Sequence, residues 1–490
     1  MASQRLVKQE VTHLRPLGWQ QDSEERYKLS TLDYLMACVY VSFAVFFKIE
    51  DDSEKPKVAE LLIKGLEKTL SQTRHLCGTI EKDPEGGHSF MKRRDSTVVF
   101  VTKWMDQGEH KETWPSFADL EKANFVSKAL GDMADYSVSP MTYGEKPEAS
   151  LDAHPKVAAF QANFIRGGLV FVMHHHHMAN DVMGWAGELH QLAENCAAIW
   201  NNTAFPTWDP ACLDLSRLTK PEYPADQQVD GPPSPEKHPG HKKSQWLLFH
   251  LPKVKAAELK KLASPADNSY WISTYDAVQA FTWRLLSRHR ARIYNPDPSS
   301  TPLWGEGVNM RKRLRNPPVP ARIQHNVLGV ALSPQAPPHA PQPTVAEITG
   351  SDGTTPLSRL AWFIRQMTDG TTQESLDAAL ESVAPVRDKT VLYLRCDSFP
   401  PMYNFTTDWR DTDVAGADFG FARPCAFRLP MEHVTPGCQV VYPPRSNDPG
   451  SDEGPELLVG FEKELTGGLL GDPEWSRYFE FRGVEAEEAD

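Results

Sequence analysis

The residues best suited to chemistry in this sequence are four consecutive histidines at 174–177, followed four residues later by Asp181. The run is internal, so it is not an expression tag. An apolar segment typical of a strand precedes it and a segment with helical spacing follows it, and α/β proteins place reactive groups at such junctions. An imidazole with an ordinary pKa of about 6.5 can take a proton from a hydroxyl near neutral pH. His177, at the strand end, is therefore a candidate catalytic base.

Two other interpretations of the histidine run stay open. Histidines at the end of a strand can bond backbone groups or meet solvent without doing chemistry. His175 and His177 are two residues apart and would share one strand face, as metal ligands can. No HExxH pattern and no nearby cluster of carboxylates and histidines accompanies them, so we expect no metal. Asp181 can cap the following helix at its positive end.

The elements expected around these residues mix helix and strand. Leucines recur at helical intervals over 58–70, and apolar residues step by three and four over 182–199. Two strands joined by a diglycine turn are predicted over 160–173, and another over 245–251. A further helix is expected after Thr274. We predict a mixed α/β fold with two subdomains, whose sheet topology the pattern leaves undefined.

A proline-rich segment, 204–244, separates two parts of similar size. Proline at this density excludes both helix interiors and central strands, so the segment is predicted to be a long connector. It divides the chain into domains at 1–203 and 245–490. Shorter surface loops are expected at 333–344 and 443–456.

Composition excludes several classes of protein. Lys and Arg number 52 against 65 Asp and Glu, which gives a net charge of −13, so the chain is a poor ligand for nucleic acid or anionic membranes. The longest apolar run, 34–47, is too short to span a bilayer, and no signal peptide is apparent. Seven cysteines without a CxxC pair argue against a disulfide framework and against a thiolate zinc site. We expect a cytoplasmic monomer.

The HxxxD motif is accompanied by further blocks whose order along the chain resembles the BAHD acyl-CoA-dependent acyltransferases. The arrangement is most similar to their fungal branch, which includes trichothecene 3-O-acetyltransferase. The blocks are an LSxxD segment at 29–33, the motif at 177–181, STYDA at 273–277 with AFTWR at 280–284, VNMRKR at 308–313 with NPP at 316–318 and His325-Asn326, TTDW at 406–409, and DFGFARP at 418–424.

The resemblance implies two α/β domains of the chloramphenicol-acetyltransferase type with mixed sheets, joined by a long crossover loop. Residues 204–244 would be the crossover. An active-site channel would run between the domains, and acyl-CoA and a small-molecule acceptor would enter it from opposite mouths. No cofactor would be bound permanently, because acyl-CoA is a co-substrate.

The resemblance also assigns roles to individual residues. His177 would be the general base, and the absence of a GxSxG serine favours direct transfer without an acyl-enzyme. Asp181 would pair with Arg311 and hold the motif in shape, a role close to plain helix capping. The indole N–H of Trp409 would stabilise the oxyanion, with Thr407 lining the same pocket. A buried core aromatic is the alternative for Trp409.

The basic cluster at 311–315 could contact the CoA phosphates through Arg311 and Arg313, although a solvated loop is an equal alternative. The block at 418–420 would be structural. The chain departs from the family pattern at Val182, at Phe421-Ala422 and at His325. We therefore expect an acyltransferase that moves an acyl group, possibly acetyl, to a hydroxyl of a secondary metabolite, with an amine acceptor open. The alternatives are a condensation-type enzyme that uses a carrier protein, or a repurposed fold that binds or cyclises a metabolite without CoA.

Overall fold

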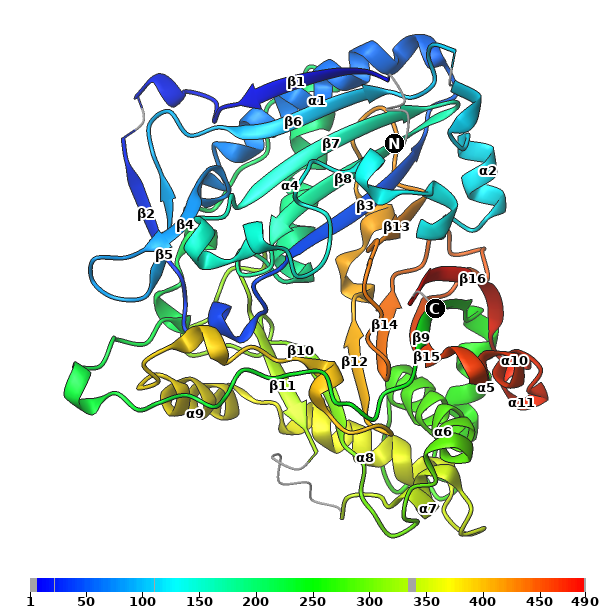
Figure 1. Cartoon of the computed structure of the whole chain (residues 1–490). Coiled ribbons are helices and arrows are strands. Elements are labelled where there is room, and N and C mark those ends of the chain that lie inside the picture. Colours follow the sequence, from blue (N-terminus) through cyan, green and yellow to red (C-terminus); the bar gives the residue numbers. More distant parts are fainter. Residues whose placement is uncertain (1–6, 22, 110, 334–340, 489–490) are drawn as a thin grey trace.

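The computed structural model describes residues 7–21, 23–109, 111–333 and 341–488. Two large sheets dominate these residues, one built mostly by the first half of the chain and one by the second (Figure 1). The small third sheet lies beside the first. The chain is thus a mixed α/β protein, as the sequence predicts. Part of the proline-rich loop expected at 333–344 lies outside the described residues.

The N-terminal sheet buries both of its faces. Along the central strand β3, Phe43 and Val45 join the core beneath α1 and α4, whereas Ala44 and Phe46 join a second core on the opposite face. This alternation follows from the two-residue period of a strand. The strand order is β1 (Lys8–Leu14), β6 (Val98–Trp104), β7 (Ala158–Ile165), β8 (Gly168–His176), β3 (Tyr40–Lys48) and β13 (Ala426–Arg428), and the small sheet contains β2 (Glu25–Lys28), β5 (His88–Lys92) and β4 (Thr79–Lys82).

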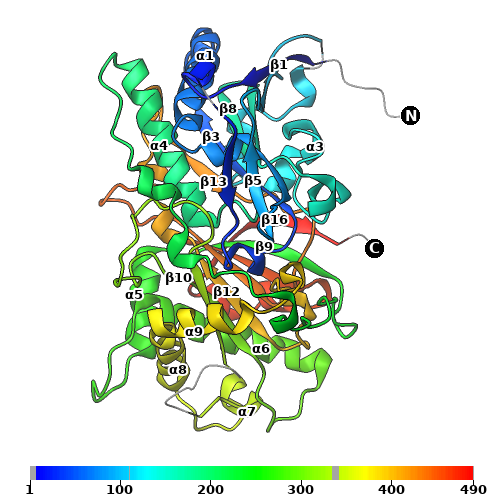
Figure 2. The same cartoon turned by 90° about the vertical axis from the view of Figure 1, so that its left-hand side faces the viewer.

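Two long helices, α1 (Lys55–Leu70) and α4 (Val182–Trp200), lie side by side on one face of this sheet (Figure 2). Both confirm the helices predicted from spacing, and β7 and β8 confirm the two predicted strands. The short helices α2 (Phe117–Lys122) and α3 (Met133–Tyr136) contribute side chains to the core on the other face. Strand β8 ends at His176, and α4 begins at Val182, so a short turn joins the strand to the helix.

The segment between α4 and the next strand contains only short 3-10 turns among its described residues, at Pro210–Leu213, Ser216–Leu218 and Ala225–Gln227. It runs along α9 (Gln373–Val383), where Arg217 pairs with Asp377 at 2.6 Å and Lys220 with Glu381 at 2.5 Å. The proline-rich segment is thus an ordered connector that packs against the second half of the chain.

The C-terminal sheet carries parallel strands at β10, β12 and β14 and antiparallel pairings elsewhere. Helices α5 (Lys253–Ala263), α6 (Thr274–Tyr294) and α8 (Leu357–Gly370) share its core, and the shorter α7 (Val345–Thr349), α10 (Thr466–Leu470) and α11 (Pro473–Ser476) complete the layer. The strand order is β11 (Leu328–Leu332), β10 (Trp304–Asn309), β12 (Asn404–Asp408), β14 (Cys438–Tyr442), β15 (Glu456–Glu462), β9 (Ser244–His250) and β16 (Glu480–Glu487).

One strand of the second half joins the N-terminal sheet. β13 comes from the second half but pairs antiparallel with β3 in the N-terminal sheet, where Ala426 faces Phe46. A buried ion pair then ties β13 back to the other sheet, because Arg428 contacts Glu456 of β15 at 2.7 Å. Residues 426–428 therefore lie in the first sheet, although the sequence places them inside a domain at 245–490. Within the described ranges no helix is both long and apolar enough to cross a bilayer.

Candidate active site

His177 is the first residue after β8, and its backbone is held from two sides. Its amide donates to the carbonyl of Val39 at 2.9 Å, and its carbonyl accepts from the side-chain amide of Asn326 at 3.1 Å. The side chain is half-buried, and its Nδ1 has no hydrogen-bond partner in the described part of the chain. Burial lowers the pKa of this imidazole. A neutral imidazole with part of its ring exposed is chemically able to act as a base there, whereas the shielded Nδ1 is not the atom that a substrate can reach.

The other three histidines of the run are committed to the protein interior. His174 bonds Ser42 Oγ at 2.8 Å and accepts from the amide of Val138 at 3.2 Å. His175 contacts Glu188 of α4 at 2.6 Å, and His176 bonds the carbonyl of Ala149 at 2.9 Å. Burial lowers the pKa of His174 to about 3 and that of His176 to about 4, so both are neutral. Of the four, only His177 is not fully buried.

The metal interpretation finds no support in the geometry. The partner of His175 is Glu188, and no group of three or more histidine, cysteine or acidic side chains among the described residues could hold a metal ion.

Asp181 both caps α4 and pairs with Arg311. Its Oδ1 accepts from the amide of Gly184 at 2.7 Å, and its two oxygens accept from the two terminal nitrogens of Arg311 at 3.0 Å each. Its Oδ2 also accepts from the amide of Val327 at 2.8 Å. Both side chains are buried, with 8% of the Asp181 and 3% of the Arg311 side chain exposed. The pair therefore fastens the start of α4 to the strand-ends of the second half.

The structure gives other partners to the two arginines expected to contact CoA. Arg311 is buried, and besides Asp181 its guanidinium donates to the carbonyls of Ile323 and His325. Arg313 donates to the carbonyls of Thr368 and Thr371 at 2.7 Å each. Arg311 could not reach a phosphate without leaving a buried carboxylate unpaired, so for this residue the structure supports the pairing with Asp181 instead. The phosphate contact of Arg313 stays a prediction.

Thr407 and Trp409 lie at the end of β12 and bond each other. The indole N–H of Trp409 donates to Thr407 Oγ1 at 3.0 Å, so the N–H expected at the oxyanion already has an acceptor. The Trp409 ring is buried against Phe43 and Tyr442, with centroid separations of 6.1 and 5.4 Å. Phe43 belongs to β3, the strand that directly follows Val39, whose carbonyl holds the His177 amide. His177 is thus held by the residue just before β3, and Trp409 packs against a residue within β3.

Two parallel strands deliver the residues of the second half to this region. Gly307 of β10 is paired with Thr407 of β12, and beyond the ends of these strands Lys312 contacts Asp411 at 3.2 Å. The carboxyl ends of parallel strands lie at one edge of a sheet, where α/β proteins place their sites. Arg311 follows β10 and Trp409 follows β12, so the sheet topology explains why both blocks reach the His177 turn or the strand beside it.

The block at 418–420 lies away from His177, as expected for a structural role. Gly420 has a φ of +84°, and a Cβ atom there would lie 2.7 Å from Cβ of Trp200, the last residue of α4. Asp181 caps the opposite end of this 19-residue helix, about 28 Å away along its axis. Phe421, where the family has tryptophan, fills space against Phe47.

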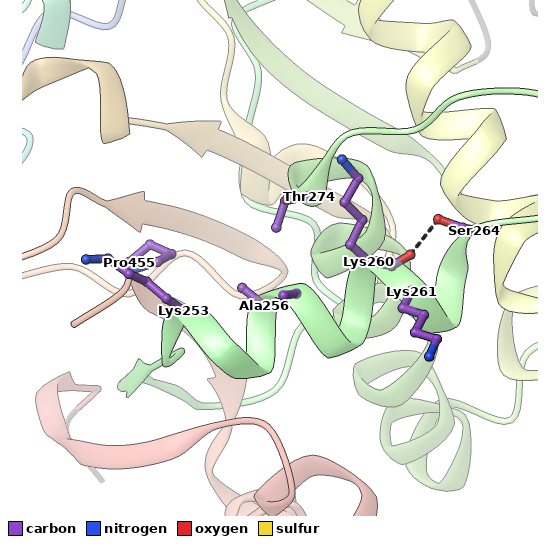
Figure 3. Close-up of a pocket in the computed structure, with 8 residues that line it drawn as sticks. Lys253, Ala256, Lys260, Lys261, Ser264, Thr274 and Pro455 are labelled. Atoms are coloured by element: carbon purple, nitrogen blue, oxygen red, sulfur yellow. Dashed lines mark hydrogen bonds between the residues drawn. The ribbon is translucent and has the colours of Figure 1, made fainter. Parts of the chain in front are cut away.

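Two further sets of residues had no assigned role in the sequence. Asp33 and Asn326 lie in blocks that the resemblance marks, and here they bond each other at 2.9 Å next to His177. Lysines of α5 line a surface pocket with a volume of about 490 Å³, which also includes Thr274 at the start of α6. Lys260 extends past Thr274 in this pocket (Figure 3). The sequence feature that could have indicated this pocket is the group of lysines at 253–261 in a chain of net negative charge.

A second pocket, of about 520 Å³, adjoins the Asp181–Arg311 pair. Met183, Leu314 and Val319 are among its apolar residues, and Asn309, Arg311, Lys312 and Arg315 add polar and basic groups. Apolar walls with a few polar groups suit a small organic molecule.

Comparison with known proteins supports a single family. A family model for the trichothecene 3-O-acetyltransferase-like N-terminal domain matches residues 39–196. The acetyltransferase FGR3 of Gibberella zeae is 57% identical over 98% of this chain and 95% of its own length. Among solved structures, F. graminearum TRI101 in complex with coenzyme A and T-2 mycotoxin has a TM-score of 0.75 at 19% identity, covering 94% of this chain and all of that one.

Vinorine synthase has a TM-score of 0.65 at 19% identity, over 94% of this chain and 96% of its own. Likeness at these low identities shows the two-domain fold, whereas the identity to FGR3 shows the family. The chain therefore belongs to the BAHD acyltransferases, in their fungal, trichothecene 3-O-acetyltransferase-like branch, and it is an acyltransferase.

Proposed function

We propose that the protein transfers an acetyl group from acetyl-CoA to a hydroxyl of a small secondary metabolite, with His177 as the general base. The observation that carries the proposal is the partial exposure of His177, the one histidine of its run that is not fully buried. FGR3 is an acetyltransferase, a TRI101 structure contains coenzyme A and T-2 mycotoxin, and TRI101 of Fusarium sporotrichioides is a trichothecene 3-O-acetyltransferase; these relatives support acetyl-CoA as donor and a hydroxylated, trichothecene-like metabolite as acceptor.

In this reaction the imidazole of His177 takes the proton of the acceptor hydroxyl while its oxygen attacks the thioester carbonyl. The tetrahedral intermediate collapses, the carbon–sulfur bond breaks, and the imidazolium returns the proton to the CoA thiolate. The lowered pKa of His177 keeps the ring neutral before the reaction, as a base must be. Asp181 takes no part in proton transfer, because its oxygens are occupied by Arg311 and two backbone amides.

Thr407 is the better candidate for the oxyanion donor. Its oxygen accepts the indole N–H of Trp409, which leaves the hydroxyl hydrogen of Thr407 available for a developing negative charge. Trp409 then orients Thr407. Thr407→Val should lower kcat by about 10²–10³-fold, while Thr407→Ser should keep most of it. Equal losses in both variants would argue against this role.

We propose that the phosphates of the donor bind in the α5 pocket. Three of its lining residues are lysines, Lys253, Lys260 and Lys261, and no carboxylate lines it. Lys260→Ala with Lys261→Ala should raise KM for acetyl-CoA and leave kcat nearly unchanged. Lys255 provides the control, because it lies on the same helix, pairs with Glu258 at 3.1 Å and does not line the pocket. An unchanged KM in the double variant would remove this assignment.

The function is tested by following release of the CoA thiol from acetyl-CoA with a panel of hydroxylated sesquiterpenoids, with mass spectrometry of the products. His177→Ala should lower acceptor-dependent release by about 10²–10⁴-fold. His241→Ala is the control. His241 lies in the connector, is also half-buried, and bonds the carbonyl of Phe399. Full activity in His177→Ala would refute the mechanism. If product formed only when the acyl group was bound to a carrier protein, the donor would be that carrier and not acetyl-CoA.

A further inference from the structure

The turn that carries His177 has no regular structure of its own. It spans 177–181, between the end of β8 at His176 and the start of α4 at Val182. Its position therefore depends on neighbouring residues, and two of its anchors come from the segment 325–326. The amide of His325 donates to the side chain of Asn180 at 2.7 Å, and the side-chain amide of Asn326 donates to the carbonyl of His177 at 3.1 Å.

Asn326 is the residue that connects His177 to a buried carboxylate. Its Nδ2 donates to both the His177 carbonyl and Asp33 Oδ1, the latter at 2.9 Å, and its backbone amide donates to the same oxygen of Asp33 at 3.1 Å. Asn326 is fully buried. Two bonds to one carboxylate oxygen fix the side-chain amide in the orientation that reaches His177.

Asp33 is in turn held rigidly. It is fully buried, and its Oδ2 accepts from the amide and the hydroxyl of Ser30 at 2.8 Å each. The Nδ1 atom of His325 lies 3.3 Å from the same oxygen, and the His325 ring stacks on His75 with centroids 4.6 Å apart. His325 has a φ of +70°, a conformation that favours glycine, so these ring contacts stabilise a backbone that the residue type alone would not select. The 325–326 segment is thereby fixed beside His177.

We propose that Asn326 is a positioning residue for His177 and that Asp33 holds Asn326 in place. This inference rests on the proposed function, in which His177 is the base. Fixing the His177 carbonyl on one side and its amide on the other sets the direction in which the imidazole leaves the backbone. A displacement of about 1 Å can cost about 10²-fold in rate, so loss of Asn326 should act on kcat. KM for acetyl-CoA should change little, because the contacts of Asn326 are inside the protein.

The test compares Asn326→Leu with Asn163→Leu. Asn163 is equally buried and donates two hydrogen bonds, to the carbonyls of Tyr136 and Val170 at 3.1 Å each, but it does not contact the His177 turn. Both variants should unfold at lower temperature than wild type. Only Asn326→Leu should lower kcat, by about 10–100-fold, with KM within about twofold. Asp33→Asn, which keeps the side-chain shape, should lower kcat in the same way and serves if Asn326→Leu fails to fold.

A second readout is independent of turnover. The rate at which diethyl pyrocarbonate modifies His177, measured by mass spectrometry of its peptide, should change several-fold in Asn326→Leu and stay at the wild-type value in Asn163→Leu. Equal kcat losses in the two asparagine variants, or wild-type kcat and modification rate in Asn326→Leu, would overturn the inference. Failure of the proposed function has a different signature, because wild type would then release no thiol while the modification rate of His177 would still respond to Asn326→Leu.

Discussion

Replacing Asp181 by asparagine separates two roles that its position combines. As the N-cap of α4, Asp181 bonds the amide of Gly184, and asparagine is an equally good cap, so a capping role alone predicts almost no loss of stability. As the partner of Arg311, it balances a guanidinium of which only 3% is exposed. Asparagine has no charge, and its NH₂ group would replace either Oδ2, which accepts from Arg311 and the amide of Val327, or Oδ1, which accepts from Arg311 and the amide of Gly184.

Removing one member of a buried ion pair costs about 3–5 kcal/mol. For an unfolding unit of about 150–250 residues, the size of each half of the chain, this free-energy loss corresponds to a fall in melting temperature of about 6–20 °C. The assay is thermal unfolding of Asp181→Asn, with the double variant Asp181→Asn/Arg311→Met to measure the coupling, expected at about 1–3 kcal/mol. Asp132→Asn is the control, since Asp132 caps α3 through the amide of Ala134 but is exposed. A melting temperature of Asp181→Asn within about 2 °C of wild type would refute the ion-pair reasoning.

Three further predictions follow from pKa directions and packing. Because burial lowers the pKa of His177, kcat/KM should rise with pH to a plateau with a midpoint below about 6.5, measured in a pH–rate profile. His174 and His176, with pKa values of about 3 and 4, bind fewer protons folded than unfolded, so stability should fall below pH 6.5, by up to about 2 kcal/mol each at pH 5 in urea titrations. Gly420→Ala should cost about 2–4 kcal/mol in unfolding free energy, because its Cβ would meet Trp200 at a left-handed φ.

Each of these predictions has a contradicting outcome. A kcat/KM midpoint at or above pH 6.5 would mean that His177 is solvated rather than desolvated. If His176→Gln loses as much stability as wild type between pH 7 and pH 5, His176 is not among the groups that take up protons on unfolding. A Gly420→Ala variant with lower kcat but unchanged stability would place the 418–420 block nearer the reaction than α4 allows.

The sequence predicts the elements around the site better than it predicts the contacts within it. Helices α1 and α4 and strands β7 and β8 are long and strongly periodic, so spacing alone identifies them. β13 has three residues, too few to show a period, and its pairing with β3 depends on a partner about 380 positions earlier. The sequence therefore gives no indication that this strand of the second half joins the N-terminal sheet.

In the histidine run, too, the sequence cannot predict the contacts, because the partners are distant along the chain. Four identical residues give no local signal that separates a base from a core histidine, because the separation is made by Ser42, Ala149 and Glu188, which lie elsewhere in the chain. Trp409 shows the complementary limit. The motif identifies the residue, but only the structure shows that its indole N–H already bonds Thr407.

The departures from the family pattern show which positions the site itself constrains. The family glycine after the motif aspartate is Val182 here, and Val182 is a half-buried first residue of α4. The nearby glycine with no room for a side chain is Gly184, where a Cβ would lie 2.5 Å from the Asn180 side chain and 2.9 Å from the carbonyl of His325. That close approach is what lets segment 325–326 reach the His177 turn. A change at 182 therefore leaves the turn intact, whereas Gly184→Ala should displace the segment that we propose positions His177.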